Sequence, residues 1–490
     1  MAEQFDVEYD LVVIGSGASG KSAAFEGARQ GLSVVVLEKA AEQGGTSNFA
    51  EGQTAFESSE QKARGVPEYN DHYPSRTEGF NRYMDYSSKR CNPEVVRMQV
   101  NNTAETIDLM KSLGIVYTYV GIYAYDQPAE LNTFHRPEGL GAHMQEVLYK
   151  ACVDAGVEFF FSTPAKSLIK DGDAVVGVVA EDSDGKSIRI GAKAVVIASG
   201  GFGGNDEMIE QYSRFTAKHI HHIEGLGTNN TGDGANMAIA AGAGTWEMGC
   251  LMLIPTAHER GLTSHISGAG MQPVLYVNKK GQRFWDEHCA LSFADWGNVL
   301  AAQEDGVGFA IFDAAQVAHL VADGSDIGLG DFIEYHQKLV NLPMELDEAV
   351  AEGVMAFQAD SIEELGAALG LDPAAFAAVV ERYNGMCDAG FDEDFFKKPE
   401  FLRPVRQGPF YAVEMNSAVL VSTGALHVNG NMQVIAAATG EPIPGLYAAG
   451  MDAGGLFGDA YNLDVPGSAN GFSHAGGRVA ARHAASVIKG

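Results

Sequence analysis

The stretch DLVVIGSGASG at residues 10–20 decides the fold of this chain of 490 residues. Its first half is an apolar run typical of a buried β-strand, and the glycines Gly15, Gly17 and Gly20 predict a tight turn into a helix. The helical sequence KSAAFEGARQG ends at Gly31, and a second apolar run, LSVVVLEK, follows it. Strand, turn, helix and strand form a βαβ unit, so the sequence predicts an α/β fold with a Rossmann-type sheet.

The glycine turn has the residues that a dinucleotide needs. One glycine makes the turn, one lets the backbone approach a pyrophosphate, and one lets helix and strand pack closely. The N-terminus of the following helix adds exposed amides and partial positive charge. Glu38 ends the second strand, where a carboxylate accepts both ribose hydroxyls. A tight turn with an N-capping serine is the alternative, but Glu38 at this spacing favours a dinucleotide.

Further glycine-rich loops favour FAD over NAD. They are GGTS at residues 44–47, ASGG at 198–201, TGDG at 231–234 and GLYAAGMD at 445–452. Each loop alone is compatible with a plain turn. Together they fit a long cofactor in an extended groove, which a short nicotinamide site does not require.

The order of the predicted elements indicates one nucleotide-binding domain that is interrupted by an insertion. Before the insertion we expect helices at 92–114 and 142–155 and strands at 157–161, 174–180, 187–190 and 192–204. Between about 249 and 422 the periodicity weakens, which predicts a separate α+β cap domain. We therefore expect the first part of the FAD-binding domain at 1–248, the cap at 249–422 and a return segment at 423–490.

Composition and charge exclude several classes of function. A chain of 52.0 kDa is too large for one ordinary hydrophobic core, so we expect two lobes. Its content of 46% hydrophobic and 20% charged residues is typical of a globular protein. A net charge of −31 argues against nucleic-acid partners and anionic membrane surfaces. The sequence lacks a run of about 18 apolar residues, and its acidic start does not resemble a signal peptide. We expect a cytoplasmic protein with no membrane span.

Cysteine and histidine spacing predicts no metal site. The five cysteines are far apart, with no CxxC, no haem motif and no iron–sulfur cluster motif, so we expect reduced thiols. The triplet His219, His221 and His222 has no supporting carboxylates at ligand spacing. Electrons must therefore come from an external donor, which the sequence does not identify.

The order GSGASG, EK, GGTS, ASGGF, TGDG and GLYAAG resembles the fumarate reductase and succinate dehydrogenase flavoprotein family over nearly the whole chain. The resemblance implies a Rossmann-type FAD domain, a mobile cap, and a substrate held between the cap and the flavin ring. Members with covalent FAD carry a histidine after the early glycines; here residues 46–49 are TSNF, so we expect non-covalent FAD. The predicted cofactor contacts are Gly15, Ser16, Gly17, Ala18, Ser19, Gly20, Glu38, Lys39, Gly44, Gly45, Thr46, Ser47, Gly52, Ala165, Ala198, Ser199, Gly200, Asn205, Thr231, Gly232, Asp233, Gly450, Met451, Asp452, Ser468 and Ala469.

The substrate site departs from the family pattern. The family binds a dicarboxylate with histidines and arginines, and those positions fall here on Ile254, Leu291, Leu420 or Val421, and Tyr461 or Asp464; the relay positions fall on Ser267 and Gly270. Buried carboxylates need paired cations, so we do not expect fumarate reduction. The replacements, with Phe457, favour a neutral, flat, partly aromatic molecule that carries hydroxyl groups.

Residues 91–142 and the N-terminal strand resemble more narrowly the tetrahydrodaidzein reductases, which form the isoflavan equol. This implies an isoflavonoid-like small-molecule substrate whose benzylic hydroxyl is replaced by hydrogen. Loss of that hydroxyl with deprotonation of the para phenol gives a quinone methide, which accepts hydride from flavin N5; the site then needs one acid and one base. The candidates are Asp464, Tyr461, His135, His288 and Tyr276.

These candidates and the substrate have alternatives. Asp464 can initiate a turn, Tyr461 can be a packed aromatic residue, and His135 can stabilise its loop. A 3-ketosteroid-type enone reductase or dehydrogenase on the same fold shares the apolar pocket. A third hypothesis is an NAD-linked dehydrogenase that holds no flavin.

Overall fold

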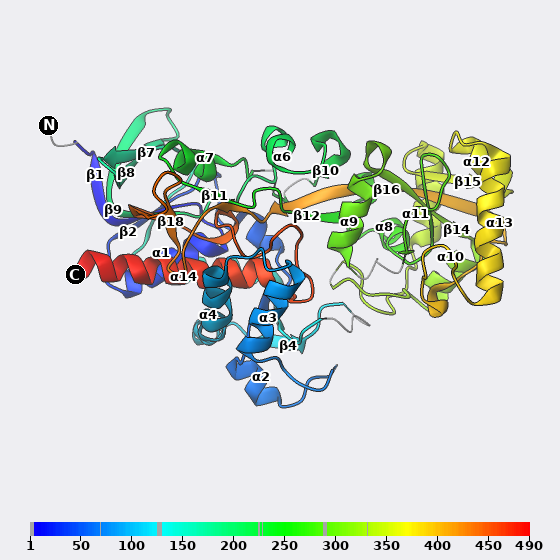
Figure 1. Ribbon diagram of the computed structural model, residues 1–490, viewed down its shortest axis with the longest axis horizontal. Coiled ribbons are helices and arrows are strands. Elements are labelled where there is room, and N and C mark those ends of the chain that lie inside the picture. Colours follow the sequence, from blue (N-terminus) through cyan, green and yellow to red (C-terminus); the bar gives the residue numbers. More distant parts are fainter. Residues whose placement is uncertain are drawn as a thin grey trace.

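The computed structural model describes residues 4–68, 70–124, 130–223, 226–227, 229–287, 292–330 and 332–490. Two lobes lie side by side along its longest axis, and β1 and the end of α14 lie at the far end of the first lobe (Figure 1). The second lobe consists of residues from the middle of the chain (Figure 1). The arrangement is therefore that of an insertion between two parts of one domain.

The first lobe is built on a sheet that has eight strands over the described residues. Its order is β18-β19-β9-β1-β2-β6, with β8 beside β9 and β7 beside β8. Parallel pairing places Leu11 of β1 opposite Val34 on one side and Ala194 on the other. The strands are β1 (Val7–Ile14), β2 (Val34–Leu37), β6 (Glu158–Phe160), β7 (Ala165–Asp171), β8 (Ala174–Glu181), β9 (Ser187–Ile197), β18 (Gln433–Ile435) and β19 (Pro442–Ala448). Because both faces of β1 are covered, Leu11 to Ile14 are all buried.

The first lobe also contains helices, and several of them carry loops of the site. They are α1 (Ala18–Arg29), α2 (Ser59–Arg64), α3 (Arg76–Tyr86), α4 (Pro93–Ser112), α5 (Leu140–Asp154), α6 (Asp206–Tyr212), α7 (Asp233–Ala240) and α14 (Ser468–Lys489). The C-terminal helix α14 packs on α1 and α4. Its buried Arg478 contacts Glu26 of α1 at 3.4 Å and Glu105 of α4 at 2.8 Å. Small sheets are formed by β3 (Gln53–Thr54), β4 (Tyr117–Gly121) and β5 (Phe134–Pro137), and by β11 (Thr245–Trp246) and β17 (Ala425–Leu426).

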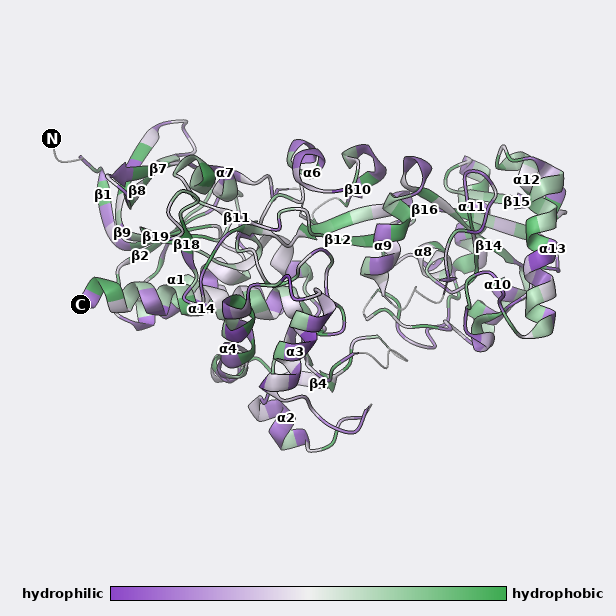
Figure 2. Ribbon diagram, in the orientation of Figure 1, coloured by the Kyte–Doolittle hydropathy of each residue, from purple (hydrophilic) through white to green (hydrophobic). Residues whose placement is uncertain are grey.

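The second lobe is built around the long strand β16 (Phe410–Ser422), which extends from the first lobe into the second (Figure 1). It pairs with β10 (Ile220–His222), β12 (Leu251–Thr256), β14 (Val307–Asp313) and β15 (Ala356–Ala359), and β13 (Leu275–Asn278) pairs with β14. The helices here are α8 (His265–Gly270), α9 (Phe293–Ala301), α10 (Ala314–Ala322), α11 (Leu342–Glu352), α12 (Ile362–Ala368) and α13 (Pro373–Ala389). Figure 2 shows β12 and β16 largely in the hydrophobic colour, in agreement with their burial.

The predicted α/β class with an inserted lobe is confirmed, and the details differ in two places. The strands expected at 187–190 and 192–204 are one strand, β9, because Gly191 stays extended beneath the Phe5 ring; a Cβ there would lie 2.7 Å from that ring. The strand β10 precedes the predicted boundary at residue 248, yet it pairs with β16. The boundaries at 248 and 422 remain a prediction.

The described residues also bear on three absences. None of their helices is both long and apolar enough to cross a membrane. No group of three or more metal-ligating side chains occurs among them. In the predicted histidine triplet, His221 stacks on His258 at 3.8 Å between ring centroids, and His222 pairs with Asp206 at 2.7 Å. The described cysteines Cys91, Cys152, Cys250 and Cys387 are free thiols.

Candidate functional site

A cavity of about 650 Å³ is lined by residues from both lobes. The first lobe contributes the glycine turn after β1, the end of β2, the 3₁₀ helix η1 (Gly45–Phe49) and the loop after β9. The second lobe contributes Met252 of β12, Leu420 and Val421 of β16, and Leu262 and Phe332 from loops. The carboxyl ends of β1, β2 and β9 thus open into one cavity, as expected for ligand binding to a parallel sheet.

The glycine turn has the geometry that its sequence predicts. Gly15 has a φ of +104°, and a Cβ on Gly20 would lie 1.9 Å from the Gly15 carbonyl oxygen, so helix and strand can approach only with glycine there. Gly17 is the N-cap of α1 and has no side chain to occupy the first turn. The N-terminus of α1 therefore presents amides and the positive end of the helix dipole to the cavity.

Glu38 and Lys39 lie beside this turn. The Glu38 carboxylate accepts hydrogen bonds from the Ser16 amide (2.9 Å), the Ser16 hydroxyl (2.8 Å) and the Ala40 amide (2.8 Å). Lys39 Nζ lies 2.7 Å from both Thr231 Oγ1 and Asp233 Oδ2. Glu38 is thus held at the cavity wall with its oxygens available as acceptors for ribose hydroxyls.

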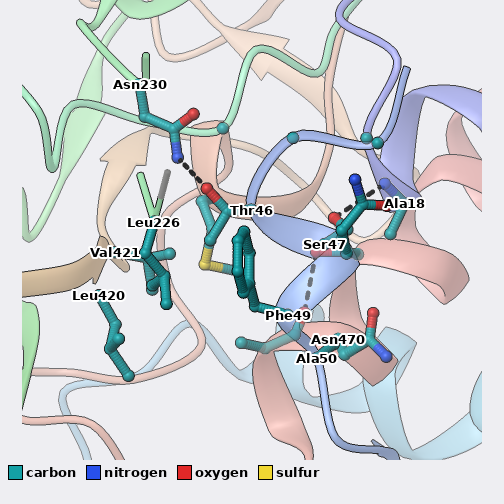
Figure 3. A pocket seen from close by; sticks show the side chains of 18 of the residues that line it. Ala18, Thr46, Ser47, Phe49, Ala50, Leu226, Asn230, Leu420, Val421 and Asn470 are labelled. Carbon is teal, nitrogen blue, oxygen red and sulfur yellow. Dashed lines mark hydrogen bonds between the residues drawn. The ribbon is translucent and has the colours of Figure 1, made fainter. Parts of the chain in front are cut away.

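The helix η1 forms the wall next to the turn. Ser47 Oγ accepts a hydrogen bond from the Ala18 amide at 3.0 Å, and Thr46 Oγ1 accepts one from Asn230 Nδ2 at 3.1 Å (Figure 3). Gly44 and Gly45 have φ values of +111° and +54°. Positive φ at both glycines lets the chain turn sharply enough to bring Ser47 against α1.

Asp452 holds the loop after β9 from behind. It is fully buried and accepts hydrogen bonds from the Gly200 amide (2.7 Å), the Gly201 amide (3.3 Å) and the Ser199 hydroxyl (3.1 Å). Burial raises the pKa of its carboxyl group to about 6. The sequence places this acid near the ribityl chain, but among the described residues that line the cavity its place is taken by its neighbour Met451.

Most predicted cofactor contacts line the cavity. They are Gly15, Ser16, Gly17, Ala18, Ser19, Glu38, Lys39, Gly44, Gly45, Thr46, Ser47, Gly52, Ala165, Ala198, Ser199, Gly200, Asp233, Met451 and Ala469. The others lie behind this lining and support it, namely Gly20, Asn205, Thr231, Gly232, Gly450, Asp452 and Ser468. Asn205, for example, donates to the Thr231 carbonyl at 2.9 Å, and Gly450 packs on Ser19.

The end of the cavity toward the second lobe is apolar. Figure 3 shows Leu226, Leu420 and Val421 grouped on one side of the pocket, opposite Ala18 and Ser47. Other lining residues of this kind are Met252, Leu262, Phe332, Tyr461 and Leu463. Among the described lining residues Lys39, which is paired with Asp233, is the single cation, and none is arginine or histidine. The described wall thus offers no cationic clamp for a dicarboxylate.

Among the described candidates for catalysis, Tyr461 lines the cavity. Its hydroxyl accepts a hydrogen bond from the Ala469 amide at 3.2 Å, and its ring stacks on Phe457 at 4.9 Å. Burial raises the pKa of the Tyr461 hydroxyl to about 12. Tyr461 therefore stays protonated near neutral pH and can donate a hydrogen bond or a proton.

Two other predicted catalytic residues, Asp464 and His135, lie outside the described lining. Asp464 is not among the described lining residues, and its carboxylate pairs with Arg82 at 3.1 Å. His135 is fully buried between the Thr133 carbonyl (2.8 Å) and the Ser58 hydroxyl (2.7 Å), and burial lowers its pKa to about 4. Strand alternation in β5 turns Phe134 to the cavity and His135 away from it. These contacts support a structural role for His135, and its catalytic role remains a prediction.

Tyr276 and His288 complete the predicted set. Tyr276 is buried in the second lobe against Trp296, with ring centroids 4.9 Å apart, and it does not belong to the described lining. Packing in that core fixes its position, and its catalytic role remains a prediction. His288 lies outside the described residues, as does Leu291.

Sequence reasoning missed several residues that line the cavity. Tyr123, Phe332, Leu226 and Asn470 belong to the lining, although none lies in a recognisable motif. Asn230 directly precedes the TGDG loop, and its bond to Thr46 could have been suspected from that position alone.

Fold and cavity define a class of flavoprotein, and comparison with known proteins identifies it. The family described as FAD binding domain matches residues 10–464. The chain is 35% identical over 489 residues to a vinyl phenol reductase of Lactiplantibacillus plantarum, covering 97% of this chain and 96% of the relative. It is 29% identical over 461 residues to a fumarate reductase (cytochrome) of Shewanella frigidimarina, covering 92% and 72%. A flavocytochrome c3 fumarate reductase solved in an open conformation superposes with a TM-score of 0.76 at 26% identity, covering 99% and 79%.

The chain therefore belongs to the FAD-binding family of fumarate reductase-like flavoproteins. Its cofactor is FAD, and it is a FAD-dependent oxidoreductase. The residues present fit this cofactor, since the N-cap Gly17 places no side chain over the N-terminus of α1 and Glu38 lines the same cavity. When bound, FAD supplies a hydride through its reduced ring.

Proposed function

We propose that this enzyme reduces a neutral phenolic substrate and delivers hydride to a benzylic carbon para to the phenol hydroxyl. The observation that carries the proposal is the apolar end of the cavity, where Leu226, Leu420 and Val421 face the site. A dianion in such surroundings loses its hydration without gaining a paired cation, at a cost of several kcal/mol per charge.

The relative from Lactiplantibacillus plantarum supports a phenolic substrate through its name, vinyl phenol reductase. If the vinyl group is para to the hydroxyl, moving the phenolic proton to the terminal carbon gives a para-quinone methide. Loss of water from a benzylic alcohol para to a phenol gives the same type of electrophile. Both substrates then accept one hydride at the benzylic carbon and one proton at the phenol oxygen, so one site geometry serves both.

Within this class we propose tetrahydrodaidzein as the substrate and equol as the product, as the narrower resemblance of residues 91–142 implies. The 4-hydroxyl would leave as water, and bound reduced FAD would supply the hydride that the 4-carbon gains. The balance is one hydride and one proton consumed for one water released. Tyr461 is the proposed acid, because it lines the cavity and its protonated hydroxyl can donate to the departing oxygen.

A substrate panel tests the proposal. The purified holoenzyme is reduced anaerobically and mixed with tetrahydrodaidzein, a para-vinylphenol, a 3-ketosteroid enone or fumarate, and the return of flavin absorbance near about 450 nm is followed. We expect reoxidation by both phenols and none by fumarate, with equol as the product of the first. Reoxidation by the enone alone would contradict the phenolic proposal. Reoxidation by the vinylphenol alone would refute only the assignment to tetrahydrodaidzein.

A further inference from the structure

Tyr123 connects the two lobes at the apolar end of the cavity. It follows β4 in the first lobe, and its hydroxyl donates a hydrogen bond to the carbonyl oxygen of Leu329 in the second lobe at 3.2 Å. Tyr123 and Phe332 both line the cavity. The contact therefore lies where a substrate would be enclosed between the lobes.

Gly330, next to Leu329, packs its backbone directly on the Tyr123 ring. A Cβ built on Gly330 would lie 2.2 to 2.3 Å from Cε2, Cζ and Oη of Tyr123, closer than real contacts allow. Gly330 also has a φ of +59°, which favours glycine. Any side chain at position 330 must therefore displace either the Tyr123 ring or the second-lobe backbone.

Each partner is fixed by its own lobe. The Tyr123 ring packs edge-to-face on Phe134 at 5.2 Å, and its amide donates to the carboxylate of the buried Glu130 at 2.6 Å. On the other side, the Leu329 amide donates to the Ile333 carbonyl at 2.8 Å. The contact thus joins two fixed points and not two loose loops.

We infer that Tyr123 is a positioning residue that seats the second lobe over the apolar end of the cavity, and that its ring restricts position 330 to glycine. The inference rests on the proposed function only for the identity of the enclosed molecule. In this arrangement the hydroxyl of Tyr123 fixes Leu329, and the adjacent Phe332 takes its place in the wall. Loss of the contact opens the apolar end of the cavity to solvent. Substrate is then retained less well, whereas the rate of the chemical step changes less.

Iodide quenching of flavin fluorescence in the oxidised holoenzyme tests this without any substrate. Tyr123→Phe removes only the hydroxyl, and Gly330→Ala introduces the clash. We expect both variants to raise the quenching constant by about twofold or more. An effect of about this size is expected when the interaction between two residues in contact is removed. Gly353→Ala is the matched control, since Gly353 has a similar φ of +68° in the second lobe with no atom within 4 Å of an added Cβ. It should leave the quenching constant unchanged.

A double-variant cycle separates the contact from general loosening. In a Tyr123→Ala background the ring atoms that the new Cβ meets are gone, so adding Gly330→Ala should have little further effect. An equal effect of Gly330→Ala in both backgrounds, or quenching constants of Tyr123→Phe and Gly330→Ala equal to that of the wild type, would overturn the inference. Thermal melting and flavin content identify variants that fail to fold, and Tyr123→Phe, which lacks one hydrogen bond only, remains decisive if Gly330→Ala does not fold.

Activity provides a second readout. With a phenol that reoxidises the enzyme, Tyr123→Phe should raise KM and the dissociation rate more than it lowers kcat, and a fall in kcat alone would contradict a positioning role. If no phenol reacts with the wild-type enzyme but the quenching results hold, only the proposed function fails.

Discussion

Arg283 holds the most heavily buried ion cluster described in the second lobe, and its replacement gives a quantitative prediction. Its guanidinium forms two bidentate pairs, with Glu287 at 2.8 and 2.6 Å and with Asp392 at 2.8 and 2.6 Å. The three side chains are only 5%, 1% and 0% exposed. The guanidinium also lies over the rings of Tyr383 and Phe395, 5.1 Å from each centroid.

In Arg283→Met the apolar contacts with the rings persist and the charge is lost. Glu287 keeps Lys397 at 3.5 Å and Asp392 keeps three backbone amides, but two buried carboxylates are then left with one buried cation. Breaking a buried pair costs about 3–5 kcal/mol, and we expect about 4 kcal/mol here. At about 2–4 °C per kcal/mol for a domain of this size, the melting temperature should fall by about 8–16 °C.

Arg382→Met is the matched control, because its pair with Asp394 lies at the surface, with side chains 56% and 29% exposed. Such pairs contribute about 0–1 kcal/mol, so melting should fall by less than about 4 °C. Both variants are compared by differential scanning calorimetry at pH 7, with flavin content as a check on the first lobe. A fall in melting temperature for Arg283→Met no larger than that of the control would refute the reasoning that this buried cluster stabilises the folded state more than an exposed pair does.

The same cluster predicts a dependence on pH. Burial acts to raise the pKa of Asp392, but hydrogen bonds from Arg283 and from backbone amides outweigh it and hold the pKa below its usual value of 3.8. A carboxyl group with a lowered pKa stabilises the folded state above its unfolded pKa and loses this contribution as pH falls. The difference in melting temperature between wild type and Arg283→Met should therefore shrink below about pH 4.

Three further predictions concern the cavity. Gly20→Ala should abolish FAD retention, since the added Cβ would lie 1.9 Å from the Gly15 carbonyl oxygen. Gly31→Ala is the control and should retain flavin, because no atom lies within 4 Å of its added Cβ. The flavin content of both variants is measured by absorbance near about 450 nm after desalting. Burial raises the pKa of Asp452 to about 6, so its contribution to stability is complete below about pH 4 and is lost as pH rises through 6. Asp452→Asn should therefore flatten the dependence of melting temperature on pH in that window. An unchanged dependence would contradict the raised pKa of Asp452. Tyr461→Phe should lower the single-turnover reoxidation rate with a phenol about 100-fold at unchanged flavin content, and a wild-type rate would remove Tyr461 from the mechanism.

Local signals predicted the nucleotide half of the molecule. The apolar run before Gly15, the glycine spacing and Glu38 all act within about 30 residues, and periodicity and turn chemistry determine such units directly. The wall residues Leu420 and Val421 were also found, because the family pattern assigns charged ligands to these positions.

The rest depends on tertiary packing that leaves no local pattern. Tyr123 meets Leu329 across 206 positions of sequence, and Phe332 belongs to a segment without periodicity. His135 looked catalytic because histidine is a common acid or base, but its neighbour Phe134 takes the face toward the cavity. Asp464 pairs with Arg82, which lies far away in sequence, so no local pattern predicts this contact.

The central claim is that the apolar end of the cavity receives an uncharged ring system, and binding to the oxidised holoenzyme tests it most directly. Titration with tetrahydrodaidzein and with fumarate, followed by the change in the flavin absorption band, gives a Kd for each. We predict that the phenol binds at least about 100-fold more tightly, equivalent to about 2.7 kcal/mol. Fumarate binding as tight as that of the phenol, or tighter, would contradict the claim.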